Sequence, residues 1–393
     1  GVGAVTPLGV GADTLLRRWL VGERAFTDGV ATCDEFDPGA FMSKKDAHRS
    51  DRFAQLAIGA ATEALDGAGW GADVPYDRYR VACLIGSGIG GIATLEDQHD
   101  SFRENGSAGV SPLVVPRIMG NAAAAAVAMR WGLRGPSASV ASACASAADA
   151  IAAGVRLIRC GAVDAAVVGG SESAVSPFIK AAFEALGAVS RCGICRPFDA
   201  RRDGFVLGEG AGVLVLENEQ RAAERGATAI GRVLGVGTSS DAYHLTAPEP
   251  TAGAAAQAIT AALLDAEIIP EDVDYVNAHG TGTRLNDRAE TDALKMALGA
   301  CASQIPVSST KSAIGHSLGA AGAVEAAVTL LALDVGIAPP TVGYEIAEEG
   351  LDLDYAAGGR ALPNGGRPLV GLSSSFGFGG HNVVLALEGR LGG

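Results

Sequence analysis

Short β-like runs alternate with alanine-rich helical stretches along the whole chain, and this alternation constrains the fold more than any other feature. Buried-strand patterns occur at residues 80–86, 165–170, 213–217, 273–278, 306–310 and 370–373. Alanine-rich segments of helical composition lie between them, for instance at residues 145–160, 254–266 and 320–335. Strands that alternate with helices favour parallel pairing under helical cover. We therefore predict an α/β protein with mainly parallel sheets that are covered on both faces.

A weak internal repeat runs through this pattern. A strand-like run at residues 137–141 leads into Cys144 and a small-residue helix, and a second run at residues 306–310 leads into Lys311 and another such helix. Two similar halves would bring these strand ends together across a pseudo-dyad. With no Pro/Ser-rich linker between them, we expect one fused unit. Its halves would cover residues 1–245 and 246–393, with a seam near residues 240–250.

Composition excludes several classes of protein. Of the 393 residues, 48% are hydrophobic and 19% charged, as in globular proteins, and 55 glycines with only 5% aromatic residues predict tight helix–sheet packing. The net charge of 30 − 44 = −14 disfavours a nucleic-acid partner. Apolar runs are broken before about 18 residues, so we expect no membrane span. Seven scattered cysteines, an odd number, predict reduced thiols in a cytoplasmic protein. Because the chain opens inside a strand-like motif, we expect its first strand to begin before Gly1.

Cys144 lies where a β-run ends and an alanine-rich helix begins. A thiol at a helix N-terminus interacts favourably with the helix dipole and with unpaired N–H groups. The effect is typically worth about 0.3–1 kcal/mol, which lowers a thiol pKa of ~8.5 by up to about one unit. A good nucleophile would still need a basic group nearby. The alternative is a small packing residue, as buried cysteines usually are.

Two of the six histidines lie in loops that follow predicted strands. His279 follows an apolar strand in a loop of glycine and threonine, and His316 ends the segment that begins at Thr310. Each could be an ordinary hydrogen-bonded loop histidine. With Cys144 in the same chain, the three residues predict a catalytic cluster in a cleft.

Other glycine and cysteine patterns carry less weight. The glycines of residues 373–382 let backbone N–H groups approach a ligand, although a β-turn is the commoner reason for such a run. Residues 86–91 only loosely match a dinucleotide fingerprint and lack the acidic residue that should follow. Cys192 and Cys195 have metal-like spacing but no second ligand pair, so we expect a surface loop and no metal site.

Five strings, in this order, resemble the β-ketoacyl-[acyl-carrier-protein] synthases of the thiolase superfamily, over Gly1 to about Leu387. They occupy residues 142–146, 203–210, 279–283, 311–316 and 376–382. The resemblance implies the thiolase fold, in which two similar α/β halves form a five-layered α-β-α-β-α core. It also implies a homodimer, or a heterodimer with a chain-length-factor homologue.

The resemblance implies an acyltransferase that condenses thioesters. Cys144 would take an acyl chain from the phosphopantetheine arm of acyl carrier protein, and malonyl-carrier protein would lose CO2 to give an enolate that attacks this thioester. His279 and His316 would stabilise the enolate oxygen. The enzyme would need no cofactor of its own, since its substrates arrive on the carrier's arm.

The resemblance also assigns supporting roles, residue by residue. Lys311, paired with Glu325, would hold His316 and favour its neutral form. The backbone N–H groups of Cys144 and Phe378 would form an oxyanion hole, with Phe378 gating the acyl pocket from the loop that Phe376 opens. The remaining implied sites are pantetheine contacts at Thr281 and Thr283, an acyl pocket at Ile89, Phe183 and the partner-facing Val114, and carrier docking at Lys44, Lys45, Arg49 and Arg52.

Three departures bear on the pathway. Gly187 stands where fatty-acid members often carry a carrier-contacting arginine, and Val114 is smaller than the aromatic residue of some members. Residues 283–288 look like those of ketosynthase subunits from discrete bacterial polyketide systems. We therefore favour a discrete (type II) polyketide or polyene system. The alternative is a housekeeping fatty-acid elongation synthase.

Three rival readings are weaker. A degradative thiolase needs a second cysteine near the C-terminus, but the last cysteine is Cys301. A non-catalytic chain-length subunit would lack the nucleophile that Cys144 supplies. A condensing enzyme primed by free coenzyme A would carry asparagine at the position of His316.

Overall fold

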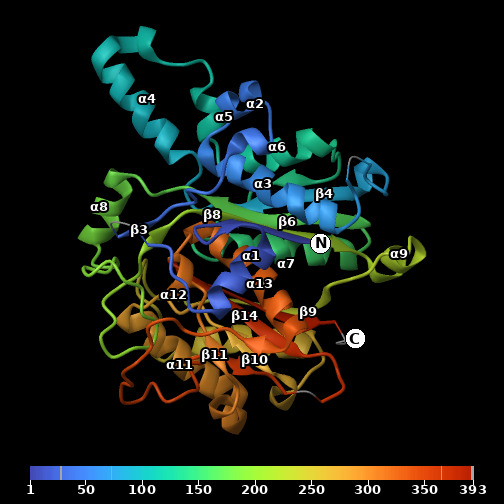
Figure 1. Cartoon of the computed structure of the whole chain (residues 1–393), viewed down its shortest axis with the longest axis vertical. Coiled ribbons are helices and arrows are strands. Elements are labelled where there is room, and N and C mark those ends of the chain that lie inside the picture. The colour runs from blue at the N-terminus through green and yellow to red at the C-terminus, as the bar shows by residue number, and fades with distance from the viewer. Residues whose placement is uncertain (27–28, 72, 364, 391–393) are drawn as a thin grey trace.

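Two stacked sheets, with helices between them and outside each, make up the computed structural model, which describes residues 1–26, 29–71, 73–363 and 365–390 (Figure 1). The first sheet has the strand order β2-β1-β8-β6-β4-β5 and the second the order β11-β10-β14-β15-β9. The first comprises β1 (Val2–Thr6), β2 (Gly9–Val10), β4 (Val81–Gly86), β5 (Ser137–Ala138), β6 (Ala165–Glu172) and β8 (Gly210–Glu217). The second comprises β9 (Gly231–Ser240), β10 (Tyr275–Asn277), β11 (Val307–Ser308), β14 (Val370–Gly377) and β15 (His381–Gly389). Two small sheets pair β3 (Val30–Ala31) with β7 (Leu207–Gly208), and β12 (Ile337–Ala338) with β13 (Arg360–Ala361).

The helices form three layers around these sheets. The outer face of the first sheet carries α3 (Arg52–Gly67) and α6 (Ala122–Trp131). Between the sheets lie α7 (Ser146–Arg159) and α13 (Ala321–Val335), and the outer face of the second sheet carries α10 (Gly253–Asp265) and α11 (Arg284–Leu298). The predicted five-layered α-β-α-β-α core is thereby confirmed.

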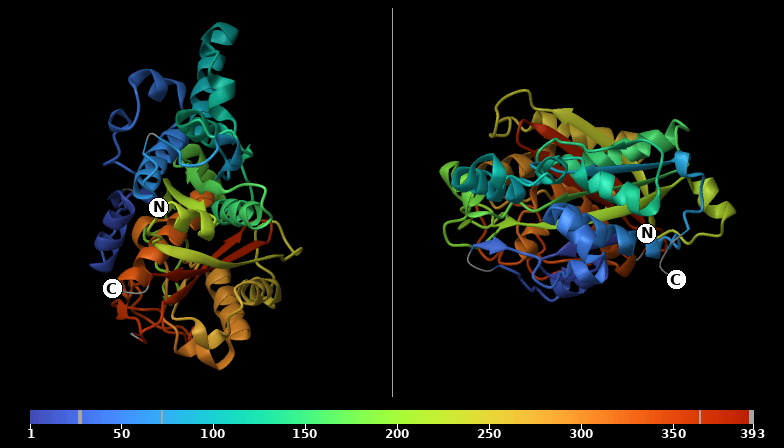
Figure 2. Two further views of the ribbon diagram at one scale, coloured as in Figure 1. Left: turned by 90° about the vertical axis from the view of Figure 1, so that its right-hand side faces the viewer. Right: turned by 90° about the horizontal axis from the view of Figure 1, so that it is seen from above.

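The remaining helices decorate this core. They are α1 (Ala12–Leu20), α2 (Lys44–Arg49), α4 (Ile92–Asn105), α5 (Val114–Ile118), α8 (Pro177–Ala185), α9 (Glu219–Glu224) and α12 (Lys311–Ile314). Helix α4 projects from the body of the molecule, as Figure 1 and the left view of Figure 2 show.

The two halves repeat one topology. In β5-β4-β6-β8-β1 and in β11-β10-β14-β15-β9, the first two pairings are parallel and the last two antiparallel. Helix α7 follows β5 as α13 follows β11. The weak repeat of the sequence therefore extends through both halves.

The prediction of mainly parallel sheets was wrong, because both sheets are mixed. Strand β8 runs antiparallel to β6, and β15 returns beside β14 through the short turn at residues 378–380. An apolar run records that a strand is buried but not the direction in which it runs. The chain passes from the first sheet to the second between Glu217 and Gly231, upstream of the predicted seam near residues 240–250. The domain boundary at 245/246 itself stays a prediction.

Glycines let helices approach the strands closely in both halves. A Cβ on Gly3 of β1 would lie 2.1 Å from the Ala60 carbonyl oxygen of α3, and a Cβ on Gly237 of β9 would lie 1.9 Å from the Ala258 oxygen of α10. These contacts are the small-residue packing that the composition predicts.

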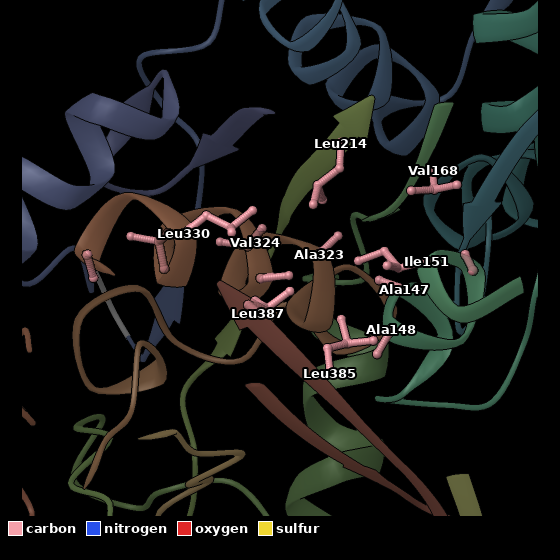
Figure 3. Packing of buried hydrophobic residues seen from close by; sticks show 14 of the residues in the cluster. Ala147, Ala148, Ile151, Val168, Leu214, Ala323, Val324, Leu330, Leu385 and Leu387 are labelled. Atoms are coloured by element: carbon pink, nitrogen blue, oxygen red, sulfur yellow. The ribbon is translucent and has the colours of Figure 1, made fainter. Parts of the chain in front are cut away.

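Helix α13 lies at the centre of the molecule. Its Ala323 and Val324 share a buried cluster with α7 and with both sheets (Figure 3). The cluster also includes Ala147, Ala148, Ile151, Val168, Leu214, Leu330, Leu385 and Leu387. Among the described residues, the segment Leu318–Val335 is the one stretch whose length and apolar composition would suit a membrane span, and 83% of it is buried inside the protein. This segment is longer than the sequence analysis expects of any apolar run, and in the structure it belongs to the central core helix and its first turn.

Candidate active site

Cys144 lies in a tight turn between β5 and α7. Ala143 before it has a φ of 52°, a left-handed conformation that costs a non-glycine residue about 1–2 kcal/mol. Hydrogen bonds hold this turn: the Ser142 N–H donates to Ser146 Oγ over 2.9 Å, and the Ala145 N–H to the Ser142 oxygen over 3.0 Å. The thiol is thus fixed at the start of α7, with 8% of the residue exposed.

His316 lies directly against this thiol. Its Nε2 is 3.1 Å from Cys144 Sγ, and its ring stands edge-on to Phe205 at 5.1 Å between centroids. The His316 backbone is held by strand-like contacts on both sides, from its N–H to the Val206 oxygen (2.7 Å) and from the Gly208 N–H to its oxygen (2.9 Å). Its Nδ1 has no hydrogen-bond partner among the described residues. The ring's tautomer is therefore not fixed by a second hydrogen bond.

His279 is held much more firmly. Its backbone N–H and that of Gly280 each donate to the Glu290 carboxylate over 2.7 Å. Its Nδ1 lies 3.3 Å from the Lys311 ammonium, which also pairs with Glu325. Since an ammonium has only donors, Nδ1 accepts and the proton of a neutral His279 is on Nε2.

The contact of Lys311 differs from the expectation. The sequence resemblance placed the Lys311–Glu325 pair behind His316, whereas the ammonium hydrogen-bonds to His279. The two imidazole rings lie 5.4 Å apart at 82°, so Lys311 acts on His316 only through its charge. The sequence shows that Lys311 is near a histidine, but the direction in which the α12 turn points decides which one.

All three groups are neutral in the free site. Burial lowers the pKa of both histidines well below the ordinary value, and the Lys311 charge lowers it further. Burial raises the pKa of the Cys144 thiol to about 11, against the opposing effects of Lys311 and of the Phe378 N–H. The expected lowering by the helix terminus is thus outweighed by desolvation.

A cavity of ≈ 470 Å³ opens onto this cluster. Its polar side includes Thr281 and Thr283, whose hydroxyls are 2.8 Å apart. Its apolar side includes Phe183, Phe376 and Phe378, and the Phe183 ring lies 5.6 Å from Phe205 and 6.5 Å from Phe378. The expected pocket residues Ile89 and Val114 do not line it within this chain.

Two backbone amides meet beside the thiol. The Phe378 N–H, in the turn after β14, faces the Cys144 sulfur and lowers its pKa. The Cys144 N–H donates to no acceptor among the residues that the structure describes. Gly377 permits this approach, because a Cβ there would lie 2.6 Å from the Ser142 oxygen. The arrangement fits the predicted oxyanion hole.

The expected docking residues fall into two groups. Lys44, Lys45 and Arg49 are exposed on α2. Arg52 is instead partly buried and already paired: its guanidinium lies 3.2 Å from Glu209 and stacks over Phe36. Arg52 is therefore not a free cation for docking.

Two groups of residues have a spacing typical of metal ligands, but only one of them brings its donor atoms together. The donor atoms of Cys144, His279 and His316 all lie within 4.8 Å of one another, a spacing that would suit a metal ion. The expectation that this enzyme uses no metal stays a prediction. Cys192 is exposed, as expected for a surface loop, but Cys195 is buried and donates towards the Thr281 oxygen over 3.5 Å. The pair forms no common site.

Glu290 and Glu172 were missed in the sequence. Glu290 lies in the second turn of α11, three residues after Asp287; an acidic residue in the first turn of a helix is a readable signal, but it marks Asp287 and not Glu290. Glu172 ends a buried strand, and only the fold shows what it contacts.

Comparisons with known proteins agree along the whole chain. Residues 19–222 match the family "Beta-ketoacyl synthase, N-terminal domain" and residues 230–345 match "Beta-ketoacyl synthase, C-terminal domain". A 3-oxoacyl-[acyl-carrier-protein] synthase 2 from Synechocystis sp. is 40% identical, over 99% of this chain and 96% of that protein.

Solved structures give the same answer. The ishigamide ketosynthase/chain length factor has a TM-score of 0.92 at 29% identity, covering 99% of this chain and 98% of that one. A type II polyketide acyl-carrier protein complex with its ketosynthase bound to the hexaketide has a TM-score of 0.89 at 28% identity, with the same coverage. The chain belongs to the β-ketoacyl synthase family of condensing enzymes, which have the thiolase fold.

Proposed function

We propose that this protein condenses malonyl-carrier protein with an acyl thioester held on Cys144, as the ketosynthase subunit of a discrete polyketide or polyene system. The observation that carries the proposal is the 3.1 Å contact between Cys144 Sγ and His316 Nε2, at a cavity of ≈ 470 Å³ that also contains His279.

Acylation begins from a neutral pair. The Cys144 sulfur attacks the carbonyl carbon of the acyl thioester while its proton passes to His316 Nε2. The carbonyl oxygen becomes negative beside the N–H groups of Cys144 and Phe378. When the C–S bond to pantetheine breaks, the departing thiolate takes the proton from Nε2. The unfixed tautomer of His316 suits this double use.

Decarboxylation uses the same histidines as donors. The bond between the malonyl carboxylate and the α-carbon breaks, CO2 leaves, and the electron pair moves into the thioester to give an enolate oxygen. Nε2–H of His279 donates to this oxygen, and so does His316 once its ring proton, which acylation leaves on Nδ1, has exchanged through water to Nε2. The Lys311 contact at Nδ1 supports this role, because it keeps the His279 proton on the cavity side.

Condensation then forms the new carbon–carbon bond. The enolate carbon attacks the Cys144 thioester carbonyl, the same two N–H groups hold the oxyanion, and the C–S bond to Cys144 breaks. The products are β-ketoacyl-carrier protein and the Cys144 thiolate, which takes up one proton from water through His316 to restore the thiol. No step needs a cofactor of the enzyme's own.

The partners are proposed on surface chemistry. An acidic acyl carrier protein would dock on Lys44, Lys45 and Arg49, and its arm would pass Thr281 and Thr283. A homodimer, or a heterodimer with a chain-length-factor homologue, would cover the apolar side chains that α4, α5 and the segments around them expose. These are Leu95, Phe102, Val110, Val115 and Met119. Val114, at the start of α5, would then reach the partner's pocket. We expect such an assembly to work in the cytoplasm.

Two pathways compete for this enzyme. Residues 283–288 and the likeness to polyketide ketosynthase structures support a polyketide or polyene system. The 40% identity to a 3-oxoacyl-[acyl-carrier-protein] synthase 2 favours fatty-acid elongation as the alternative.

Intact-mass analysis tests both the assignment of Cys144 as the nucleophile and the choice between the two pathways. We expect acyl-carrier protein to add one acyl group to the wild type and none to Cys144→Ala. Equal labelling of the two would contradict the nucleophile assignment. With malonyl-carrier protein and no reductase present, products extended by several unreduced two-carbon units support the polyketide system. A single extension that then stalls would contradict an unreduced polyketide and supports a system that reduces each unit, as fatty-acid elongation and polyene synthesis do.

A further inference from the structure

Glu172 is a buried carboxylate that the reaction steps above do not use. It ends β6 and is fully buried. One oxygen accepts the Gly88 N–H (2.6 Å) and the Gly319 N–H (3.2 Å), and the other accepts the Ser87 hydroxyl (3.0 Å) and the Ile89 N–H (3.3 Å). Burial raises the pKa of Glu172, and the four donors that converge on its carboxylate oppose that rise by stabilising the ionised form.

These donors come from two loops in different halves of the molecule. Residues 87–89 follow β4 in the first half, whereas Gly319 follows His316 by three residues in the second half. The loops are in direct contact: a Cβ on Gly319 would lie 2.3 Å from the Gly88 nitrogen and 2.7 Å from the Glu172 oxygen. Glu172 is therefore the group that joins the loops flanking the thiol.

The position of the His316 imidazole depends on this contact between the two loops. Its Nδ1 makes no hydrogen bond among the described residues, so the backbone on either side sets the position of the ring. Val206 and Gly208 bind the N–H and the carbonyl oxygen of His316 itself, and Glu172 holds the segment that follows through the Gly319 N–H. A shift of about 1 Å in a reacting group can cost about 100-fold in rate.

We propose that Glu172 is a positioning residue that fixes the loop after His316 against the loop after β4, and so sets the His316–Cys144 contact. This proposal rests on the roles proposed above for Cys144 and His316. Glu172 also acts on the thiol through its charge, since it raises the pKa of Cys144 together with Glu325, while Lys311 lowers it. The neutral imidazoles of His316 and His279 are the other titratable groups that face the thiol.

The test is Glu172→Gln, which keeps the size of the side chain but turns an NH2 group towards backbone N–H donors. Loss of the charge should shift the pH curve for Cys144 alkylation by iodoacetamide, followed on the Cys144 peptide by mass, to lower pH. Loss of the join should lower kcat by about 10–100-fold with a smaller change in KM. The thiol thus becomes easier to ionise while turnover becomes slower, a combination that loss of folding stability alone would not give.

Glu63→Gln is the matched control. The Glu63 carboxylate also accepts backbone N–H groups, from Ala4 and Ala12, but it lies on α3 outside the first sheet. We expect its alkylation curve and kcat to match the wild type. An unshifted curve in Glu172→Gln, or a kcat within about twofold of Glu63→Gln, would overturn the proposal.

Ser87→Ala serves if Glu172→Gln does not fold. It removes one donor and keeps the charge, so kcat should fall several-fold with an unshifted alkylation curve; wild-type kcat would overturn the proposal. Alkylation needs no carrier protein and no malonyl group, so it reports on Glu172 even if the proposed pathway is wrong.

Discussion

At the residue scale, the chemistry of the site is decided by competition between burial and charge. The helix start, the Lys311 ammonium and the Phe378 N–H all favour a Cys144 thiolate, yet burial outweighs them and the thiol stays neutral. Burial and the same ammonium also keep both histidines neutral. Cys144 and the two histidines are therefore uncharged before substrate binds, and charge develops at the site only during the reaction.

Lys311→Met should make Cys144 harder to ionise. Because Lys311 lowers the pKa of Cys144, its removal raises that pKa, and the alkylation curve shifts to higher pH. The pKa of both histidines should rise, since the same charge depresses them. With the His279 proton no longer held on Nε2, kcat should fall by about 10²–10³-fold. Iodoacetamide kinetics between pH 7 and 10 and steady-state turnover measure the two effects.

The buried partner needs its own control. Lys311→Met leaves Glu325 unpaired, which costs about 3–5 kcal/mol of stability. The double variant Lys311→Met, Glu325→Gln removes that charge and should recover much of the melting temperature but not the activity. Recovered turnover in the double variant would contradict a role for Lys311 at His279.

The sequence identified the reacting residues more readily than their contacts. Cys144, His279 and His316 each follow a strand-like run, and strand ends that share an edge converge. That Lys311 contacts His279 depends on the pairing of β10 with β11, which places the ends of these two strands side by side. The neutral state of Cys144 depends on burial by residues scattered along the chain. Neither the Lys311–His279 contact nor the neutral state of Cys144 can be predicted from a local sequence pattern.

At the element scale, the directions of the strands and the inward position of Arg52 could not be predicted from the sequence. Apolar runs predicted β4, β6 and β8 well, but not their directions, because an apolar run reads the same both ways. The basic cluster of α2 was read as one docking set, yet Arg52 starts the next helix and turns inward to Glu209. Only the exposed members remain available to a carrier.

Lys45→Glu combined with Arg49→Glu should weaken turnover of carrier-bound substrates, chiefly through KM and most strongly at low salt. Activity with a short pantetheine thioester that lacks the protein should be unchanged. Arg221→Glu, on α9, is a matched surface control. Carrier kinetics that stay at the wild-type level at low salt would contradict docking on α2.

Gly237→Ala should destabilise the fold, since the new Cβ would meet the Ala258 oxygen of α10 and force helix and strand apart. A loss of about 1–3 kcal/mol is expected for such overpacking. Gly67→Ala, near the end of α3 with its nearest neighbour atom 3.9 Å away, should be neutral or slightly stabilising. Thermal denaturation compares them, and equal melting temperatures would contradict the close-packing account.

At the scale of the whole molecule, the repeated topology explains where the site lies. Equivalent strand ends of the two halves meet at the site, where the first half supplies Cys144 and the second supplies both histidines and Lys311. The sequence disclosed this repeat only faintly, because topology is shared between the halves while their side chains have diverged. The exposed apolar residues near α4 and α5 form the face that we propose a second subunit covers.

We expect the purified protein to behave as a dimer, or to become one when co-expressed with a chain-length-factor homologue. Light scattering after gel filtration should give twice the chain mass. Val115→Lys with Phe102→Glu should yield monomers, because charges would replace exposed apolar side chains. A monomer of full activity would contradict the assembly.

The neutral, recessed thiol also has a consequence for covalent inhibitors. Cys160 and Cys192 are exposed, so a small, indiscriminate electrophile will meet them first at neutral pH. Cys144 will be modified selectively only by compounds that fill the aromatic-walled cavity and place their own carbonyl or epoxide oxygen beside the Cys144 and Phe378 amides. Selectivity for this enzyme should therefore be sought in the shape of a compound and not in the strength of its warhead.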